Sequence, residues 1–173
     1  MSCFGVLCGP RAMTQKHQRA PNTAAQCPLM QESPAFPQTQ ARILGVGVDI
    51  CSIQRMGAAY SRQGDRIVRR LLTPAEQTLF AQRYEKNPHR GMQFLSSRFA
   101  AKEALSKAIG SGIRGMMGFQ SASILPDELG KPCIHLHGDL TKMFKHHRWL
   151  PHISISDEDD CVVAYCLIEI LVA

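Results

Sequence analysis

The spacing of hydrophobic residues predicts one long helix in the middle of the chain. Between residues 94 and 108, five apolar residues recur at helical intervals and form one stripe: Phe94, Ala101, Ala104, Leu105 and Ala108. Such a stripe lets a helix lie on a hydrophobic core. Most of these side chains are small or unbranched, so we expect a sheet to approach the helix closely. The pattern ends at Gly110, which is typical of a helix end.

Other patterns place strands and shorter helices around this helix. Before the long helix we expect a strand at 42–48, a helix at 50–61, a helix opened by the capping box Thr73–Glu76 and ended by 87–88, and a loop at 88–91. After it we expect a hairpin of 120–125 and 132–137, a basic helix at 139–149 and a hairpin of 152–156 and 161–172. This order predicts an α+β fold, in which an antiparallel sheet packs against a long central helix.

The first 41 residues have a different composition from the rest. They contain five prolines and many Gln, Ser and Thr residues, without the period of a helix or strand. We therefore expect an extended or disordered leader at 1–41 and one domain at 42–173. The apolar start lacks the basic region of a secretory signal, but three basic residues against one acidic residue leave an organellar transit peptide open.

Composition limits the classes of function. The chain has 45% hydrophobic and 20% charged residues, and no apolar run is long enough to cross a bilayer, so we expect no membrane insertion. Its seven cysteines form no C-x-x-C pair and favour a reducing compartment, which we take to be the cytoplasm. Five histidines between residues 135 and 152 lack metal-finger spacing and are interpreted as ordinary surface residues.

Three charged residues are the first candidates for chemistry. Glu103 and Lys107 project one turn apart on a second face of the long helix, where Phe99 indicates a cleft or a subunit boundary. An ordinary surface ion pair is the plainer interpretation of the two charges. Asp49 ends the first strand, and if it faces Glu103, the two carboxylates suit Mg²⁺, which completes its shell with water and substrate phosphates. Carboxylates without histidine or thiolate argue against zinc.

Two motifs of defined spacing run through these segments. The first is Gly47-Val48-Asp49-Ile50 with Arg55 six residues after the aspartate, and the second, R-F-x-x-K-E-A-x-x-K-A-x-G, runs from Arg98 to Gly110. Together they resemble the holo-acyl-carrier-protein synthases, a family of 4'-phosphopantetheinyl transferases. The resemblance covers the chain from about residue 43 to its C-terminus. This sequence departs from the family pattern at Ser156, where many relatives carry a histidine. The departure bears on the contact to the 3'-phosphate of the coenzyme.

The resemblance implies an enzyme of fatty acid biosynthesis with a defined reaction. The 4'-phosphopantetheine arm of coenzyme A moves to a serine of an apo acyl carrier protein, and adenosine 3',5'-bisphosphate leaves. The resemblance assigns Mg²⁺ to Asp49 and Glu103, as the two carboxylates themselves permit. We expect Lys107 to lie beside the same phosphates, and Glu103 to accept the serine proton directly or through a bound water.

Other residues of the motifs have two interpretations each. For Lys102, a solvated side chain and a contact to the cofactor are equally good interpretations. Glycines at the end of the long helix permit close approach of a nucleotide, although glycine commonly ends helices. The segment Gly130-Lys131-Pro132 is first a turn and second a contact to a cofactor phosphate. The expected coenzyme contacts are Lys107, Gly110, Gly112, Lys131 and Pro132.

A local excess of positive charge indicates the partner. Five arginines face a single Asp65 in one short segment, and they are Arg55, Arg62, Arg66, Arg69 and Arg70. Such a segment attracts an acidic acyl carrier protein, with Arg55 and Arg62 as the main expected contacts. The resemblance also implies a homotrimer with coenzyme sites at the subunit boundaries.

Two alternatives belong to other functional classes. The first is a small basic α+β domain that binds nucleic acid, which is disfavoured because the basic segment lacks interleaved aromatic residues for base stacking. The second is a catalytically silent scaffold that keeps the fold. The intact Asp49, Glu103 and Lys107 argue against it.

Overall fold

The structure is a computed structural model that describes residues 42–172. The chain separates into two units, Met1–Gln38 and Thr39–Ala173, and all described residues belong to the second. The leader expected at 1–41 lies outside the described residues.

The described unit has an α+β fold with antiparallel sheets, as the sequence predicts. Its elements are β1 (Arg42–Ser52), α1 (Ile53–Gln63), α2 (Asp65–Leu71), α3 (Pro74–Lys86), α4 (Pro88–Ile109), β2 (Ala122–Pro126), β3 (Pro132–Leu136), α5 (Gly138–His147), β4 (Trp149–Asp157) and β5 (Cys161–Ile170). Strands β1, β5 and β4 form one antiparallel sheet in that order, and β2 and β3 form a separate hairpin. Both expected hairpins are therefore present.

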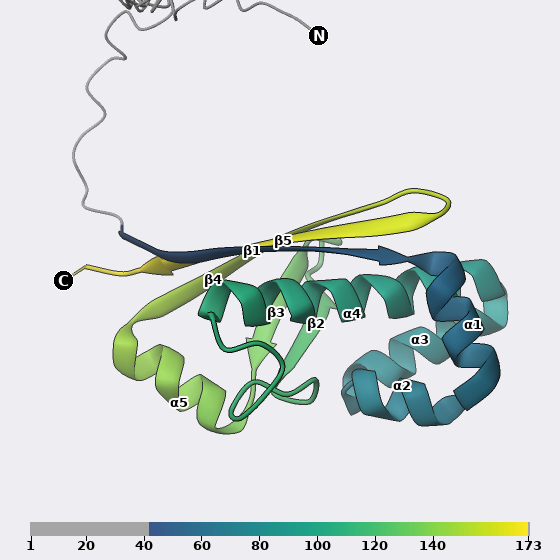
Figure 1. Ribbon diagram of the computed structural model, residues 1–173, viewed down its shortest axis with the longest axis horizontal. Helices are drawn as coiled ribbons and strands as arrows, with labels where there is room; N and C mark the ends of the chain where they lie inside the picture. The colour runs from purple at the N-terminus through teal and green to yellow at the C-terminus, as the bar shows by residue number, and fades with distance from the viewer. Residues whose placement is uncertain (1–41, 173) are drawn as a thin grey trace, which may run out of the picture. The chain divides into compact units, whose positions relative to one another are not determined.

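Helix α4 lies along one face of the three-stranded sheet, with α1, α2 and α3 gathered at one of its ends (Figure 1). All five residues of the predicted apolar stripe are buried. The close approach expected at the first strand is also present. A Cβ atom added to Gly45 would overlap the carbonyl oxygen of Ala108, and one added to Gly47 would overlap that of Ala104. The sheet therefore rests on the backbone of α4 at these two positions.

Several boundaries differ from the sequence-based expectation, among them that of the basic helix, since α5 ends at His147 and β4 already begins at Trp149. Strand β1 continues to Ser52, whose hydroxyl accepts a hydrogen bond from the backbone N–H of Arg55, so α1 begins only at Ile53. Helix α4 begins at Pro88, not after residue 91, because the side chain of Asn87 caps its first turn. The arginine-rich segment after Gly64, which we assigned to no element, is the short helix α2.

The end of α4 follows the prediction. Gly110 has a left-handed backbone (φ 83°), and its N–H donates to the carbonyls of Ser106 and Lys107. The N–H of Gly112 donates to the Ser106 carbonyl as well. These hydrogen bonds satisfy carbonyls at the C-terminus of α4 that have no partner within the helix.

No helix within residues 42–172 is long and apolar enough to cross a membrane. The four described cysteines are free thiols: Cys51, Cys133, Cys161 and Cys166.

Substitution at the two kinds of glycine tests the contact between sheet and helix. We expect Gly47→Ala to lower the free energy of unfolding by about 1–3 kcal/mol, because its methyl group has no space beside the Ala104 carbonyl. Gly57→Ala is the matched control, since it lies in α1 with open space around it. It should stabilise by about 0.5–1 kcal/mol through helix propensity. Urea unfolding measures both, and equal stability of Gly47→Ala and the wild type would contradict the contact.

Candidate active site

Asp49 lies within β1, three residues before the strand ends at Ser52, and it meets Lys107 of α4. The Nζ atom of Lys107 lies 2.8 Å from Oδ1 of Asp49 and 2.9 Å from the carbonyl oxygen of Val48. The side chain of Asp49 is 16% exposed and that of Lys107 is 49% exposed, so the pair lies at the border of the protein interior. The sequence motifs placed both residues at the site, but nothing in their spacing indicated a direct ion pair across 58 residues.

Glu103 lies within electrostatic reach of this pair. Burial raises the pKa of the Glu103 carboxyl, the negative charge of Asp49 raises it further, and the ammonium of Lys107 lowers it. Oδ2 of Asp49 is buried and has no hydrogen-bond partner among residues 42–172. Two neighbouring carboxylates, one with an unused buried oxygen, fit a hard divalent cation.

The donor set also limits the kind of metal. Within the described part of the chain, no group of three or more His, Cys, Asp or Glu side chains is placed to hold an ion. A cation at Asp49 and Glu103 would therefore depend on water and substrate oxygens for the rest of its shell. Mg²⁺ accepts such a shell, whereas structural zinc usually takes four protein ligands.

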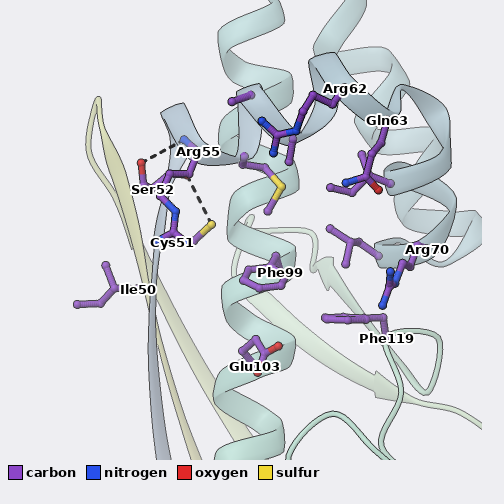
Figure 2. Close-up of a pocket in the computed structure, with 15 residues that line it drawn as sticks. Ile50, Cys51, Ser52, Arg55, Arg62, Gln63, Arg70, Phe99, Glu103 and Phe119 are labelled. Carbon is purple, nitrogen blue, oxygen red and sulfur yellow. Dashed lines mark hydrogen bonds between the residues drawn. The ribbon is translucent and has the colours of Figure 1, made fainter.

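A cleft of about 590 Å³ opens beside Glu103, bounded by α4, α1, α2 and the end of β1. Figure 2 shows Phe99 and Glu103 one turn apart on α4, both at this cleft. The expectation that the face carrying Phe99 borders a cleft is therefore confirmed. Phe119, from the loop after α4, stacks on Phe99 with ring centroids 5.7 Å apart and supplies a second aromatic wall.

Arginines of α1 and α2 line the opposite side of the cleft. Arg55 and Arg62 come from α1, and Arg70 from α2, where its side chain points toward Phe119 (Figure 2). Arg66 and Arg69 are exposed on α2 and do not line the cleft. The structure thus brings three of the five predicted arginines to the same cavity as Glu103.

Lys102 corrects both sequence-based interpretations of that residue. It is neither solvated nor directed at a cofactor, because its side chain is fully buried. Its Nζ atom donates to Oε2 of Glu76 at 2.6 Å and to the carbonyls of Leu71 and Phe119 at 2.8 and 2.7 Å. Burial lowers the pKa of the ammonium, whereas the charge of Glu76 opposes this change.

Glu76 has a wider role than the predicted capping box. Its Oε2 atom accepts from the backbone N–H of Thr73, which confirms the box, and from the Thr73 hydroxyl. Its Oε1 atom accepts from the N–H of Ile124 in β2. Because Lys102 binds the same carboxylate, Glu76 connects α3, α4 and β2. A capping glutamate is common in sequences and the burial of Lys102 is seen only in the structure, so no sequence signal indicated this role.

A second pocket of about 430 Å³ lies along the N-terminal half of α4. It is lined by Arg83, Arg90, Gln93, Phe94, Ser97, Arg98 and Asp157. Two guanidinium groups lie over the Phe94 ring, with Cζ of Arg98 at 4.0 Å and that of Arg83 at 4.4 Å from the centroid. This concentration of cations is suited to an anion.

The guanidinium groups of this pocket differ in their anchoring. Arg98 donates to the Ile124 carbonyl and to the Ser97 hydroxyl, both at 2.9 Å, and burial lowers its pKa to about 10. One terminal nitrogen of Arg83 is buried without a hydrogen-bond partner in the described chain. Ser156, where the sequence departs from many relatives, directly precedes Asp157 at the rim of the pocket. Sequence spacing gave no indication of this pocket.

None of the predicted coenzyme contacts, Lys107 included, lines either of the two pockets. Gly110 and Gly112 lie in the turn after α4 and have left-handed backbones. Lys131 is exposed in the β2–β3 turn, where its N–H donates to the side chain of Asp127, and Pro132 begins β3. Their assignment to the coenzyme stays a prediction.

Comparisons with known proteins identify relatives across most of the chain. Residues 45–166 match the family model described as the 4'-phosphopantetheinyl transferase superfamily. The holo-[acyl-carrier-protein] synthase of Leptothrix cholodnii is 44% identical over 127 residues, which cover 73% of this chain and 96% of that protein. The corresponding protein of Methylibium petroleiphilum is 42% identical over the same lengths.

Solved structures give the same result. The crystal structure of holo-[acyl-carrier-protein] synthase from Neisseria meningitidis is 36% identical, with a TM-score of 0.67 over 73% of this chain and 98% of that chain. The Bacillus anthracis enzyme, solved in complex with CoA (3',5'-ADP), is 29% identical, with a TM-score of 0.63 over 75% and 98% of the two chains. The fold expected from the resemblance is thereby confirmed.

The titration of Glu103 tests the charge cluster. Asp49→Asn should lower the pKa of the Glu103 carboxyl because it removes a neighbouring negative charge, whereas Lys107→Met should raise it because it removes a positive one. Carboxyl-detected NMR with labelled glutamate measures both shifts. The exposed Asp139, which pairs with Lys142, provides the control variant Asp139→Asn that should leave Glu103 unchanged. Shifts of the same sign in both test variants would contradict the assigned cluster.

Proposed function

Because this chain belongs to the 4'-phosphopantetheinyl transferase superfamily, we propose that it transfers the 4'-phosphopantetheine moiety of coenzyme A to a serine of an apo acyl carrier protein. The observation that carries the proposal is the charge cluster of Asp49, Glu103 and Lys107 beside an arginine-lined cleft. The family match replaces the nucleic-acid-binding alternative, which no comparison supports. The charge cluster retains Asp49, Glu103 and Lys107, which argues against a catalytically silent scaffold.

The reaction is an in-line displacement at phosphorus. The serine oxygen forms a bond to the phosphorus of the pantetheine phosphate, and the bond from that phosphorus to the bridging oxygen breaks. Adenosine 3',5'-bisphosphate leaves with the bridging oxygen, and the serine gives up its proton to a base. Glu103 lies at the cleft, and burial raises the pKa of its carboxyl, which makes it a stronger proton acceptor than an ordinary surface carboxylate.

Asp49 and Glu103 are the residues we propose for Mg²⁺, with Lys107 beside them. The ion would supply charge neutralisation for the pyrophosphate during the displacement. Two observations support this assignment: Oδ2 of Asp49 is buried without a hydrogen-bond partner among the described residues, and the negative charge of Asp49 raises the pKa of Glu103. Lys107 holds Asp49 in place through Oδ1 and presents a half-exposed ammonium that can contact substrate phosphate.

The arginines of α1 and α2 are the proposed contact for the carrier protein. Arg55, Arg62 and Arg70 line the cleft that holds Glu103, so an acidic carrier bound there would present its serine beside the charge cluster. Arg66 and Arg69 extend the same positive surface outside the cleft. Residues contacting the coenzyme would then include Lys107, with Gly110, Gly112, Lys131 and Pro132 as further predicted contacts. We place this activity in the cytoplasm and in fatty acid biosynthesis.

The outer face of the sheet supports self-association. Val46, Val48 and Ile50 alternate along β1 with their side chains exposed, and Ile50 is 67% exposed. Tyr165 of β5, which pairs with Val48, extends the apolar surface to the neighbouring strand. Contiguous apolar surface of this kind marks interaction sites, and a homotrimer would bury it around a threefold axis.

The two cationic regions support a coenzyme site shared between subunits. Arg98 and Glu103 are five residues apart on α4 and therefore point in directions about 140° apart around the helix. One coenzyme that reaches both the arginine pocket and the charge cluster would more easily use one region from each of two neighbouring subunits. The arginine pocket would then hold a phosphate of the nucleotide end.

Transfer of a labelled arm tests the proposed function. With fluorescent coenzyme A, Mg²⁺ and an apo acyl carrier protein, the wild type should label the carrier, and a chelator should abolish labelling. Asp49→Asn should reduce the rate about a hundredfold or more, because the stabilisation of the transferred phosphate by a cation amounts to several kcal/mol. Asp139→Asn, on α5, should retain the wild-type rate. No transfer to any of several carriers, with salt-sensitive nucleic-acid binding instead, would contradict the function.

Mixing two inactive variants tests the shared site. Asp49→Ala removes a residue of the charge cluster, and Arg90→Ala removes an exposed arginine of the second pocket. If each site takes Asp49 from one subunit and Arg90 from its neighbour, co-expression in equal amounts should restore about a quarter of the wild-type activity in a random trimer. Size-exclusion chromatography with light scattering gives the mass of the assembly. Complete absence of recovery in a mixed oligomer would show that each site lies within one chain.

A further inference from the structure

The short helix α2 depends on other segments for its position. It has seven residues and carries Arg66, Arg69 and Arg70. Helices of this length are not stable by themselves in water. The last carbonyls of a helix also lack partners within the helix. The partners that α2 finds for these groups therefore determine where its arginines point.

Two side chains of other helices and one backbone N–H bind carbonyls at the C-terminal end of α2. Lys102 of α4 donates to the Leu71 carbonyl at 2.8 Å. Gln77 of α3 donates to the Leu72 carbonyl at 2.8 Å. The Val68 carbonyl accepts from the backbone N–H of Leu72. These contacts leave the carbonyls of residues 69 and 70 for a further donor.

Gln120 is that donor. Its Nε2 atom lies 3.0 Å from the carbonyl oxygen of Arg69, 3.3 Å from that of Arg70 and 2.9 Å from that of Leu72. One side-chain amide thus completes the end of α2. Gln120 itself belongs to the loop between α4 and β2, which is also held by the bond from Lys102 to the Phe119 carbonyl.

The same residue connects the two walls of the cleft. Gln120 directly follows Phe119, whose ring stacks on Phe99 and whose carbonyl accepts from the buried Lys102. Arg70, which lines the same cleft, lies beside Phe119 with its side chain directed toward it (Figure 2). The amide of Gln120 therefore fixes the backbone that carries Arg70 relative to the backbone that carries Phe119.

We propose that Gln120 is a positioning residue for the carrier protein, because it holds the backbone of Arg70, the α2 arginine that lines the same cleft as Glu103. This role rests on the proposed function, in which α1 and α2 bind the carrier. Gln120 makes no contact with Asp49, Glu103 or Lys107 among its hydrogen bonds. Its effect should therefore be on recognition of the carrier, and not on the coenzyme or the chemical step.

The test replaces the amide while the volume is kept. Gln120→Met removes both N–H donors and leaves a flexible side chain of similar length. We expect the KM for the carrier protein to rise about fivefold or more, as for the loss of one charged interface contact. The kcat at saturating carrier and the KM for coenzyme A should stay within about twofold of the wild type. Gln77→Met is the matched control, because Gln120 still binds the Leu72 carbonyl when Gln77 is removed.

A double-mutant cycle with Arg70 separates positioning from general loss of stability. In an Arg70→Ala background, Gln120→Met should change the carrier KM by less than about twofold, since its effect passes through that arginine. If Gln120→Met does not fold, Gln120→Asn is measured, which keeps the amide but withdraws it from α2. A folded variant with unchanged carrier KM, or one that lowers kcat and raises both KM values alike, overturns the role. Failure of the wild type to transfer at all would instead refute the proposed function.

Discussion

A fully buried ion pair between Lys102 and Glu76 holds the described domain together. Taking both charges out of water costs several kcal/mol each, and this cost is offset only when every donor and acceptor is satisfied. Here the ammonium has three oxygen acceptors, and the carboxylate accepts from Thr73 and Ile124 as well. Removal of one partner would leave the other charge buried and unpaired, at a cost of about 3–5 kcal/mol.

This interior pair also determines the outer face of α4. Lys102 and Glu103 are neighbours on the helix, so the rotation that buries the first directs the second into the cleft. The same ammonium holds the carbonyls of Leu71 and Phe119, which belong to two walls of that cleft. The arrangement of the candidate site is thus established from the core outward.

Much of this could be predicted from the sequence, because the signals are local. The apolar stripe of α4, the capping box and the hairpins each depend on neighbouring residues, and they were found where expected. Long-range polar contacts left no such signal. Lys102 was misassigned because a lysine is usually solvated, and the pairing of Lys107 with Asp49 joins residues 58 positions apart. The arginine pocket combines α3, α4 and β4, whose side chains meet only in the folded chain.

The bare glycines of β1 have a consequence for how the domain can vary. Gly45 and Gly47 bring the strand onto the carbonyls of Ala108 and Ala104, so main-chain atoms act as the spacer between sheet and helix near Asp49. Where side chains fill the space between a strand and a helix, substitution of those side chains changes the distance between the two elements. Backbone atoms are the same for every residue type, so core residues elsewhere can be substituted while Asp49 and Glu103 keep their separation.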